Sequence, residues 1–234
     1  MSELVVHHLP GAWGLPSVSP FCLKLDAYLR IAAIEHRTVL APTPFGGPKG
    51  KAPWIEHEGR RLGDSGFIID YLRSHFGVDP DAGLTPVERA SSLALRRLIE
   101  ENLYWTMVYD RWMVEENWVV FRNAVLGGLP ALMRPIITPM ARRGVRQQLR
   151  GHGIGLHARG EIHAVGQRDI GALSDFLGEK PYFMGDKPTE LDAVAYGQLA
   201  NIIDAPIATP IKDEAKARPN LVGFVERIKN RYYA

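Results

Sequence analysis

The feature that most constrains the fold of this chain is a change of pattern after about residue 80. The first 76 residues alternate short strand-like and helix-like runs, in the order β-α-β-loop-β-β-α. The last two strands flank Glu58-Gly59, a two-residue turn signal that predicts a hairpin. Beyond residue 86 the strand signals disappear, and apolar residues recur at helical spacing. The sequence therefore predicts an α/β domain followed by an all-α domain.

Residues rich in helix and strand breakers indicate where the two domains meet. Residues 78–86 contain two prolines and a glycine and are predicted to be a linker. The predicted domains are therefore residues 1–77 and residues 87–234.

The second domain is predicted to consist of several helices. Residues 87–126 form a long helical stretch without Gly or Pro, whereas residues 132–150 are helical in pattern but interrupted by two prolines. Further helices are expected over residues 160–177, after the cap signal at Thr189, and from Pro219.

Local signals also mark where helices start and end in the first domain. Ser19 is a favoured N-cap, and Pro20 stands at the first helical position, where its missing N–H is harmless. Ser65 is predicted to cap the next helix, which Gly77 ends. Because the first of these helices follows a strand and a loop, its N-terminus is a natural site for an anion.

Composition excludes several classes of protein. The 234 residues are 46% hydrophobic and 23% charged, as in an ordinary globular protein. No apolar run reaches the roughly 18 residues that a membrane-spanning helix needs. Met1-Ser2-Glu3 lacks the basic region of a secretory signal, so a cytoplasmic protein is expected.

The single cysteine, Cys22, excludes an internal disulfide framework and a multi-cysteine zinc site. Cys22 shares a helical stripe with apolar residues, which predicts a buried, poorly reactive thiol.

The histidines do not predict a metal site. His7 and His8 are adjacent on a predicted strand and would point to opposite faces of the sheet. The three histidines between residues 152 and 163 have only Glu161 as a nearby acidic ligand.

Charge is unevenly distributed, although the net charge is only +2. Residues 117–160 contain no acid and include seven arginines. Two interpretations remain open, a solvated helical face or a surface for phosphate groups, anionic lipid or an acidic ligand. Nucleic-acid binding is not expected, because aromatic residues do not alternate with these arginines as stacking platforms would.

Four local signatures, in the order of the two domains, carry a resemblance to a known family. They are Ser19-Pro20-Phe21-Cys22, Ala52-Pro53-Trp54, Asp64-Ser65 and Thr189-x-x-Asp192. With these signatures the chain resembles the cytosolic glutathione S-transferases, in which a thioredoxin-like domain precedes a helical domain. Two further segments look most like the branch that contains metaxins, failed-axon-connections proteins and bacterial relatives; they are Trp13-Gly14-Leu15-Pro16-Ser17 and Gly153-Ile154-Gly155-x-His157.

The resemblance implies that a residue near the first helix stabilises the thiolate of glutathione, the form that attacks an electrophile. Ser19-Pro20-Phe21-Cys22 is also similar to the Cys-Pro-x-Cys of glutaredoxins, which aligns Ser19 with the reactive position. Ser19 is therefore the first candidate and Ser17 the second, unless Ser19 serves only as a cap and Ser17 only as a loop residue. Family members also use Tyr or Cys in this role, but no Tyr precedes this helix.

The resemblance also implies how the rest of glutathione is held. Relatives place a cis-proline at the position of Ala52-Pro53, and this bend would present the backbone of Ala52 to the cysteinyl segment of the ligand. Asp64 would pair with the ammonium group of the γ-glutamyl end, and Ser65 at the helix start would hold its carboxylate. The alternative for Asp64-Ser65 is a helix cap without a ligand.

An aromatic stripe in the second domain has two interpretations. Tyr104, Val108 and Trp112 recur every four residues on one helix face, beside Tyr109. They could belong to the core, or they could line a pocket for an apolar electrophile opposite the first domain.

The implied function is that of a glutathione S-transferase. Glutathione would be the co-substrate, its thiolate would attack a small hydrophobic electrophile, and a homodimer is expected because most relatives dimerise. Two alternatives stay open. One is a non-catalytic interaction or membrane-surface module, suggested by the apolar and basic residues between positions 129 and 150. The other is a glutathione-dependent isomerase.

Overall fold

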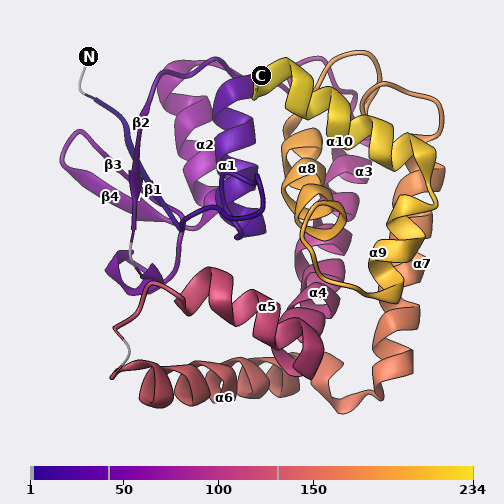
Figure 1. Ribbon diagram of the computed structural model, residues 1–234. Helices are drawn as coiled ribbons and strands as arrows, with labels where there is room; N and C mark the ends of the chain where they lie inside the picture. Colours follow the sequence, from indigo (N-terminus) through magenta and orange to yellow (C-terminus); the bar gives the residue numbers. More distant parts are fainter. Residues whose placement is uncertain (1–2, 42, 131, 234) are drawn as a thin grey trace.

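Residues 3–41, 43–130 and 132–233 are described by the computed structural model of the chain (Figure 1). Four strands form a sheet in the order β2-β1-β3-β4, in which β1 and β2 are parallel and β3 is antiparallel to both of its neighbours. This part is the predicted thioredoxin-like domain. Its elements are β1 (Val5–His8), α1 (Pro20–Ile31), β2 (Arg37–Leu40), the short helix η1 (Pro44–Gly46), β3 (Trp54–His57), β4 (Arg60–Gly63) and α2 (Ser65–Phe76).

The strand register brings three connections to one edge of this sheet. Trp54, the first residue of β3, pairs with His7 near the end of β1 and with Gly63 at the end of β4. The loop from β1 to α1, the Ala52-Pro53 segment before β3 and the residues after β4 therefore meet at the same edge. His57 and Arg60, which flank the β3–β4 turn, lie at the opposite edge.

The second part of the chain is helical, as predicted, and Figure 1 shows α1 and α2 lying between the sheet and most of these helices. Within the described residues, no helix has the length and apolar character that crossing a membrane requires. The elements are α3 (Pro86–Arg97), the π-helical η2 (Leu98–Leu103), α4 (Tyr104–Met113), α5 (Glu115–Leu126), α6 (Arg134–His152), the short η3 (Ile154–Leu156), α7 (Arg159–Leu177), α8 (Glu190–Ile203), α9 (Pro210–Lys216) and α10 (Pro219–Tyr232).

Two predictions about these helices were wrong. The stretch 87–126 is not a single helix, because Val114 has extended backbone (φ −77°, ψ 119°) and separates α4 from α5. Conversely, α6 is continuous despite its prolines. Pro135 lies in the first turn, where its N–H would have no helical partner, and the exposed surroundings of Pro139 allow water to reach the carbonyl group that it leaves unbonded.

Two smaller differences concern the cap of one helix and the presence of a short one. The cap of α2 is Asp64 and not Ser65, which is the first helical residue; Oδ1 of Asp64 accepts a hydrogen bond from the N–H of Gly66 at 3.0 Å. The short α9 was not predicted, because seven residues are too few for a clear helical period.

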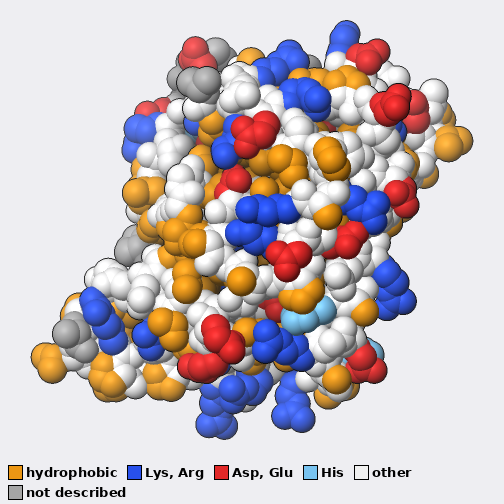
Figure 2. Space-filling model, turned by 45° about the vertical axis from the view of Figure 1, so that its right-hand side comes forward, with side chains coloured by type: hydrophobic (Ala, Val, Ile, Leu, Met, Phe, Trp, Pro, Cys, Tyr) orange, Lys and Arg blue, Asp and Glu red, His pale blue; other side chains and the backbone are white. Residues whose placement is uncertain are grey.

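The α6 helix lies at the lower edge of the molecule in Figure 1, where Figure 2 shows Lys and Arg side chains beside hydrophobic ones. Its inner side is fixed by Arg142, which donates hydrogen bonds to the carbonyl oxygens of Trp112 and Met113 at 2.8 and 3.3 Å. Several large apolar side chains on this helix and just before it are exposed; they are Leu132, Met133, Ile136 and Met140.

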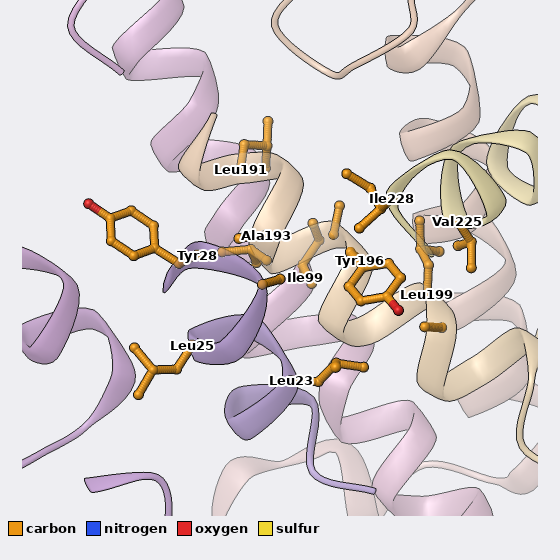
Figure 3. Packing of buried hydrophobic residues seen from close by; sticks show 14 of the residues in the cluster. Leu23, Leu25, Tyr28, Ile99, Leu191, Ala193, Tyr196, Leu199, Val225 and Ile228 are labelled. Atoms are coloured by element: carbon orange, nitrogen blue, oxygen red, sulfur yellow. The ribbon is translucent and has the colours of Figure 1, made fainter. Parts of the chain in front are cut away.

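The hydrophobic core is continuous from the first domain to the second (Figure 3). On α1, Leu23 points toward α8 and Leu25 points to the other side of the helix. The two helices approach so closely that a Cβ on Gly197 would lie 2.5 Å from the carbonyl oxygen of Pro20, so this position requires glycine. Burying a leucine side chain such as that of Leu23 stabilises a fold by about 1.5–3 kcal/mol. The contact between α1 and α8 is therefore a main link between the domains.

Candidate functional site

Ser19 and Ser17 hold the start of α1 in different ways. Oγ of Ser19 accepts a hydrogen bond from the N–H of Cys22 at 3.4 Å, an acceptor role that does not use its own proton. Ser17 is completely buried, and its hydroxyl donates to the carbonyl oxygen of Leu9 at 2.8 Å while accepting from the N–H of Ser19 at 3.3 Å. The hydroxyl proton of Ser17 is thus committed to the loop, whereas that of Ser19 can be donated to a bound group.

Cys22 lies in the first turn of α1 and is buried, as its place in the apolar stripe predicted. Burial raises the pKa of its thiol, and the nearby hydroxyls of Ser19 and Ser17 only partly oppose this shift. The thiol is therefore neutral at physiological pH and is a poor nucleophile.

The segment that enters β3 has the geometry that the resemblance implies. The peptide bond between Ala52 and Pro53 is cis. Pro53 is buried and Ala52 is half-buried, so the backbone of Ala52 lies near the surface at the edge where α1 begins.

Asp64 adopts an uncommon backbone conformation at the start of α2. Its φ of +83° is in a region that non-glycine residues rarely occupy, and such residues cluster at ligand sites. While Oδ1 caps the helix, Oδ2 lies 3.8 Å from the ammonium nitrogen of Lys49. The side chains of Asp64 and Lys49 are both about half exposed, so a ligand can reach each of them. Ser65, directly after Asp64, is buried in the first turn.

The four aromatic-stripe residues do not all face the first domain. The ring of Tyr104 meets Phe21 of α1 edge to face, with centroids 4.9 Å apart, so it lies at the junction of the domains. Val108 belongs to a buried cluster within the helical domain, and Tyr109 packs against the same cluster. Trp112 stacks on Trp118 of α5, with ring centroids 5.0 Å apart. The structure thus brings Tyr104 next to the start of α1 and packs the others among helices.

One residue near the site was not predicted. Arg111 of α4 is buried, and its Nη1 donates to the carbonyl oxygen of Val18, directly before Ser19, at 2.8 Å. Its Nη2 donates to the backbone oxygen and to Oδ1 of Asn201 on α8. Burial lowers the pKa of Arg111 to about 10, so it remains charged at neutral pH. The only signal in the sequence is an arginine on a helix among aromatic residues.

Comparison with known families gives two matches to domain models. The model of the glutathione S-transferase N-terminal domain matches residues 20–117, and that of the glutathione S-transferase C-terminal domain matches residues 166–228.

Curated relatives cover nearly the whole chain. The isoprene-epoxide–glutathione S-transferase of Rhodococcus sp. (strain AD45) is 34% identical over 98% of this chain and 99% of its own length. Failed axon connections of Drosophila melanogaster is 33% identical over 94% of this chain but only 55% of its own length. Human metaxin-2 is 25% identical over 96% of this chain and 86% of its own length.

Solved structures share the fold at low sequence identity. A beta-etherase from a Sphingobium strain has a TM-score of 0.62 at 18% identity, covering 97% of this chain and 95% of that chain. A delta-class glutathione transferase from Nilaparvata lugens has a TM-score of 0.56 at 13% identity, covering 98% of this chain and 90% of that chain. These structures show the fold alone. The domain matches and the relatives above place the chain in the glutathione S-transferase family, on the branch that includes metaxins, Failed axon connections and bacterial relatives.

Proposed function

We propose that this protein is a glutathione transferase that binds glutathione at the sheet edge where α1, β3 and α2 begin. The observation that carries this proposal is the meeting of three elements at that edge: the cap Ser19, the cis Ala52-Pro53 segment and the Asp64-Ser65 helix start. Each element provides a chemically suitable partner for a different part of the tripeptide.

The γ-glutamyl end of glutathione carries an ammonium and a carboxylate group side by side. The ammonium replaces that of Lys49 as the partner of Oδ2 of Asp64, because the present pair at 3.8 Å is exposed and weak. The carboxylate binds at the N-terminus of α2 beside Ser65, where helix N–H groups and the helix dipole favour an anion. The cysteinyl backbone pairs with the backbone of Ala52 in the manner of an added strand.

The sulfur then lies at the start of α1. Lowering the pKa of a free thiol from about 8.5 to about 6.5 requires roughly 2.7 kcal/mol of differential stabilisation. A hydrogen bond from Ser19 to the charged sulfur contributes about 1.5–3 kcal/mol, and the helix dipole contributes about 0.3–1 kcal/mol. These two sources together are sufficient. Ser19 is the preferred donor because Ser17 already donates its proton to Leu9.

A small hydrophobic epoxide is a suitable first electrophile to test, because a relative 34% identical to this chain is named for isoprene epoxide. The thiolate forms a C–S bond with an epoxide carbon, the C–O bond breaks, and the alkoxide takes up a proton. Tyr104 is a candidate proton donor, because its ring contacts Phe21 near the start of α1. Burial raises its pKa, which makes it a weaker acid but keeps its hydroxyl protonated at neutral pH.

Isothermal titration of the full chain with glutathione tests the binding step. Binding at millimolar concentration or tighter is expected, and Asp64→Ala should weaken it roughly 10- to 100-fold through the loss of a charged hydrogen bond. Asp70→Ala is the matched control, because Asp70 is an exposed acid on the same helix. Undetectable binding to the wild-type chain, or equal affinities for both variants, would overturn the proposal.

A second candidate function is favoured by the surface of α6. The apolar residues Ile136 and Met140 are 64% and 68% exposed, and no acid lies among residues 117–160 to repel an anionic surface. The arginines at positions 143, 146 and 150 continue the same helix. An apolar end followed by basic residues suits a helix that lies on a bilayer of anionic lipid.

Co-sedimentation with phosphatidylserine-containing vesicles tests this second candidate. Binding at low salt is expected, with loss at high salt and in the double variant Ile136→Asp and Met140→Asp. Val87→Asp is the control, since Val87 is 75% exposed on α3 but lies outside the acid-free segment. Failure of the wild-type chain to bind at low salt would exclude the membrane function.

A further inference from the structure

Two histidines and a glutamate meet at the sheet edge opposite the glutathione site. His57 is the last residue of β3, Glu58 begins the turn to β4, and His75 lies in the last turn of α2. One ligand atom from each of the three residues lies within 4.8 Å of the other two. Within residues 3–41, 43–130 and 132–233, this is the one group of three His, Cys, Asp or Glu side chains that meets this condition.

The separations suit a small metal ion after slight movement of the side chains. Nε2 of His75 is 3.8 Å from Oε1 of Glu58, and the rings of His57 and His75 are edge to face with centroids 4.7 Å apart. Ligand atoms around tetrahedral Zn²⁺ with bonds of about 2.0–2.2 Å lie about 3.4 Å apart. The side chains of Glu58 and His75 are exposed by 51% and 32%, so they can rotate to close the remaining distance.

The least exposed of the three residues is already held in place. His57 is buried, and its Nδ1 is hydrogen-bonded to the hydroxyl of Tyr71 at 2.8 Å. Metal-binding histidines typically use one ring nitrogen for the metal and the other for such a partner, which fixes the ring. Tyr71 also stacks on His75 with centroids 5.4 Å apart, so one aromatic residue orients both imidazoles.

The position of Glu58 is unusual for a residue of its type. Glu58 and Gly59 have φ values of +49° and +72°, the left-handed conformation of the two-residue turns that join strands. Asn, Asp or Gly is preferred at the first of these positions, because a longer side chain makes the left-handed conformation less favourable. A glutamate here places a carboxylate beside His75, which a ligand role accounts for and the turn alone does not.

We propose that His57, Glu58 and His75 form a binding site for a divalent transition-metal ion, with Zn²⁺ as the best fit. Two imidazoles and one carboxylate are a donor set that Zn²⁺ commonly takes, with a water molecule in the fourth position. The ion ties the β3–β4 turn to the end of α2. Binding to the folded chain therefore raises its stability. The site lies away from Asp64 and Ser19, so it acts independently of glutathione.

Zinc titration of the chelator-treated full chain, without glutathione, tests this site. Zn²⁺ at about 100 times its dissociation constant should raise the melting temperature by several degrees. Substitution His75→Ala should weaken zinc affinity at least about 10-fold, and Glu58→Gln should weaken it by a similar factor. Variants at these two exposed positions avoid the misfolding that a change at the buried His57 would risk.

The control is His157→Ala. His157 and Glu161 form an exposed pair with Nδ1 and Oε2 3.7 Å apart, much like His75 and Glu58. Among the residues that the structure describes, however, no third ligand joins this pair. This variant should bind zinc as the wild-type chain does. Co²⁺ provides a second readout, because its visible absorption bands should appear in the wild-type chain and disappear in His75→Ala. Absence of zinc-dependent stabilisation in the wild-type chain, or equal zinc affinity in His75→Ala and His157→Ala, would overturn the proposal.

Discussion

Nη1 of Arg111 donates a hydrogen bond to the carbonyl oxygen of Val18 at 2.8 Å, and this bond joins the helical domain to the residue before the cap of α1. The guanidinium also donates to Asn201 on α8. Its charge is therefore satisfied by oxygen dipoles inside the protein. The position of Ser19, at the centre of the proposed glutathione site, depends in this way on a residue of the second domain.

Replacing Arg111 should disturb both stability and glutathione binding. Arg111→Met leaves the oxygens of Val18 and Asn201 without donors, and we expect the free energy of unfolding to fall by about 2–4 kcal/mol. Urea denaturation measures this loss, and Arg97→Met on exposed α3 surface should change it by less than about 0.5 kcal/mol. Equal stability of the two variants would contradict the structural role assigned to Arg111.

Glu190 should be a second strong link between the domains. It is 2% exposed, accepts from Arg73 of α2 at 2.7 Å and also accepts from Arg96 of α3. Glu190→Gln removes the negative charge between two guanidinium groups, so thermal and urea unfolding should show a loss of roughly 3–5 kcal/mol. The exposed pair of Glu3 and Arg37 is the comparison, and Glu3→Gln should cost less than about 1 kcal/mol. Similar losses for both variants would show that burial adds nothing to the Glu190 contacts.

Asp169 should make the protein less stable as pH rises through the acidic range. Burial raises its pKa to about 6, although Asn102 donates to the carboxylate at 2.8 and 3.1 Å. In the unfolded chain the pKa is about 3.9, so between these values the folded state binds more protons than the unfolded state. Its contribution to the free energy of unfolding therefore declines from about pH 4 to above pH 6, by up to about 3 kcal/mol.

The variant Asp169→Asn isolates this effect, because the amide has the same shape and no titrating proton. Urea denaturation at a series of pH values should show that the difference in stability, variant minus wild type, grows with pH between about 4 and 6.5. A difference that is constant over this range would mean that Asp169 titrates normally in the folded protein.

Features of the fold that depend on neighbouring residues could be predicted from the sequence. Pro20 after a serine cap, the Glu58-Gly59 turn and the left-handed Gly77 that ends α2 are all present, because each is decided within a few residues. The capping box of Thr189 and Asp192 is also present, and the backbone nitrogen of Thr189 donates a hydrogen bond to Oδ2 of Asp192 at 2.7 Å. The break at Val114 had no such signal, since neither Gly nor Pro marks it.

Features that depend on contacts between distant segments could not be predicted. The partner of Arg111 is a backbone oxygen in another domain, and no residue pattern identifies it. His57 and His75 meet only because α2 packs back on the hairpin. The proposed glutathione site is intermediate. Its candidate residues were identified from short signatures, whereas their meeting at one edge follows from the strand register.

The most direct test of the central claim is the pH titration of the glutathione thiol bound to this protein, followed by the ultraviolet absorbance of the thiolate. In the wild-type complex the apparent pKa should lie roughly two units below the value of about 8.5 for a free thiol. Ser19→Ala should raise it toward the free value, and Ser17→Ala should change it little, because the hydroxyl of Ser17 donates to Leu9. A bound thiol that titrates like free glutathione in the wild-type complex, or identically in the wild type and Ser19→Ala, would contradict the account.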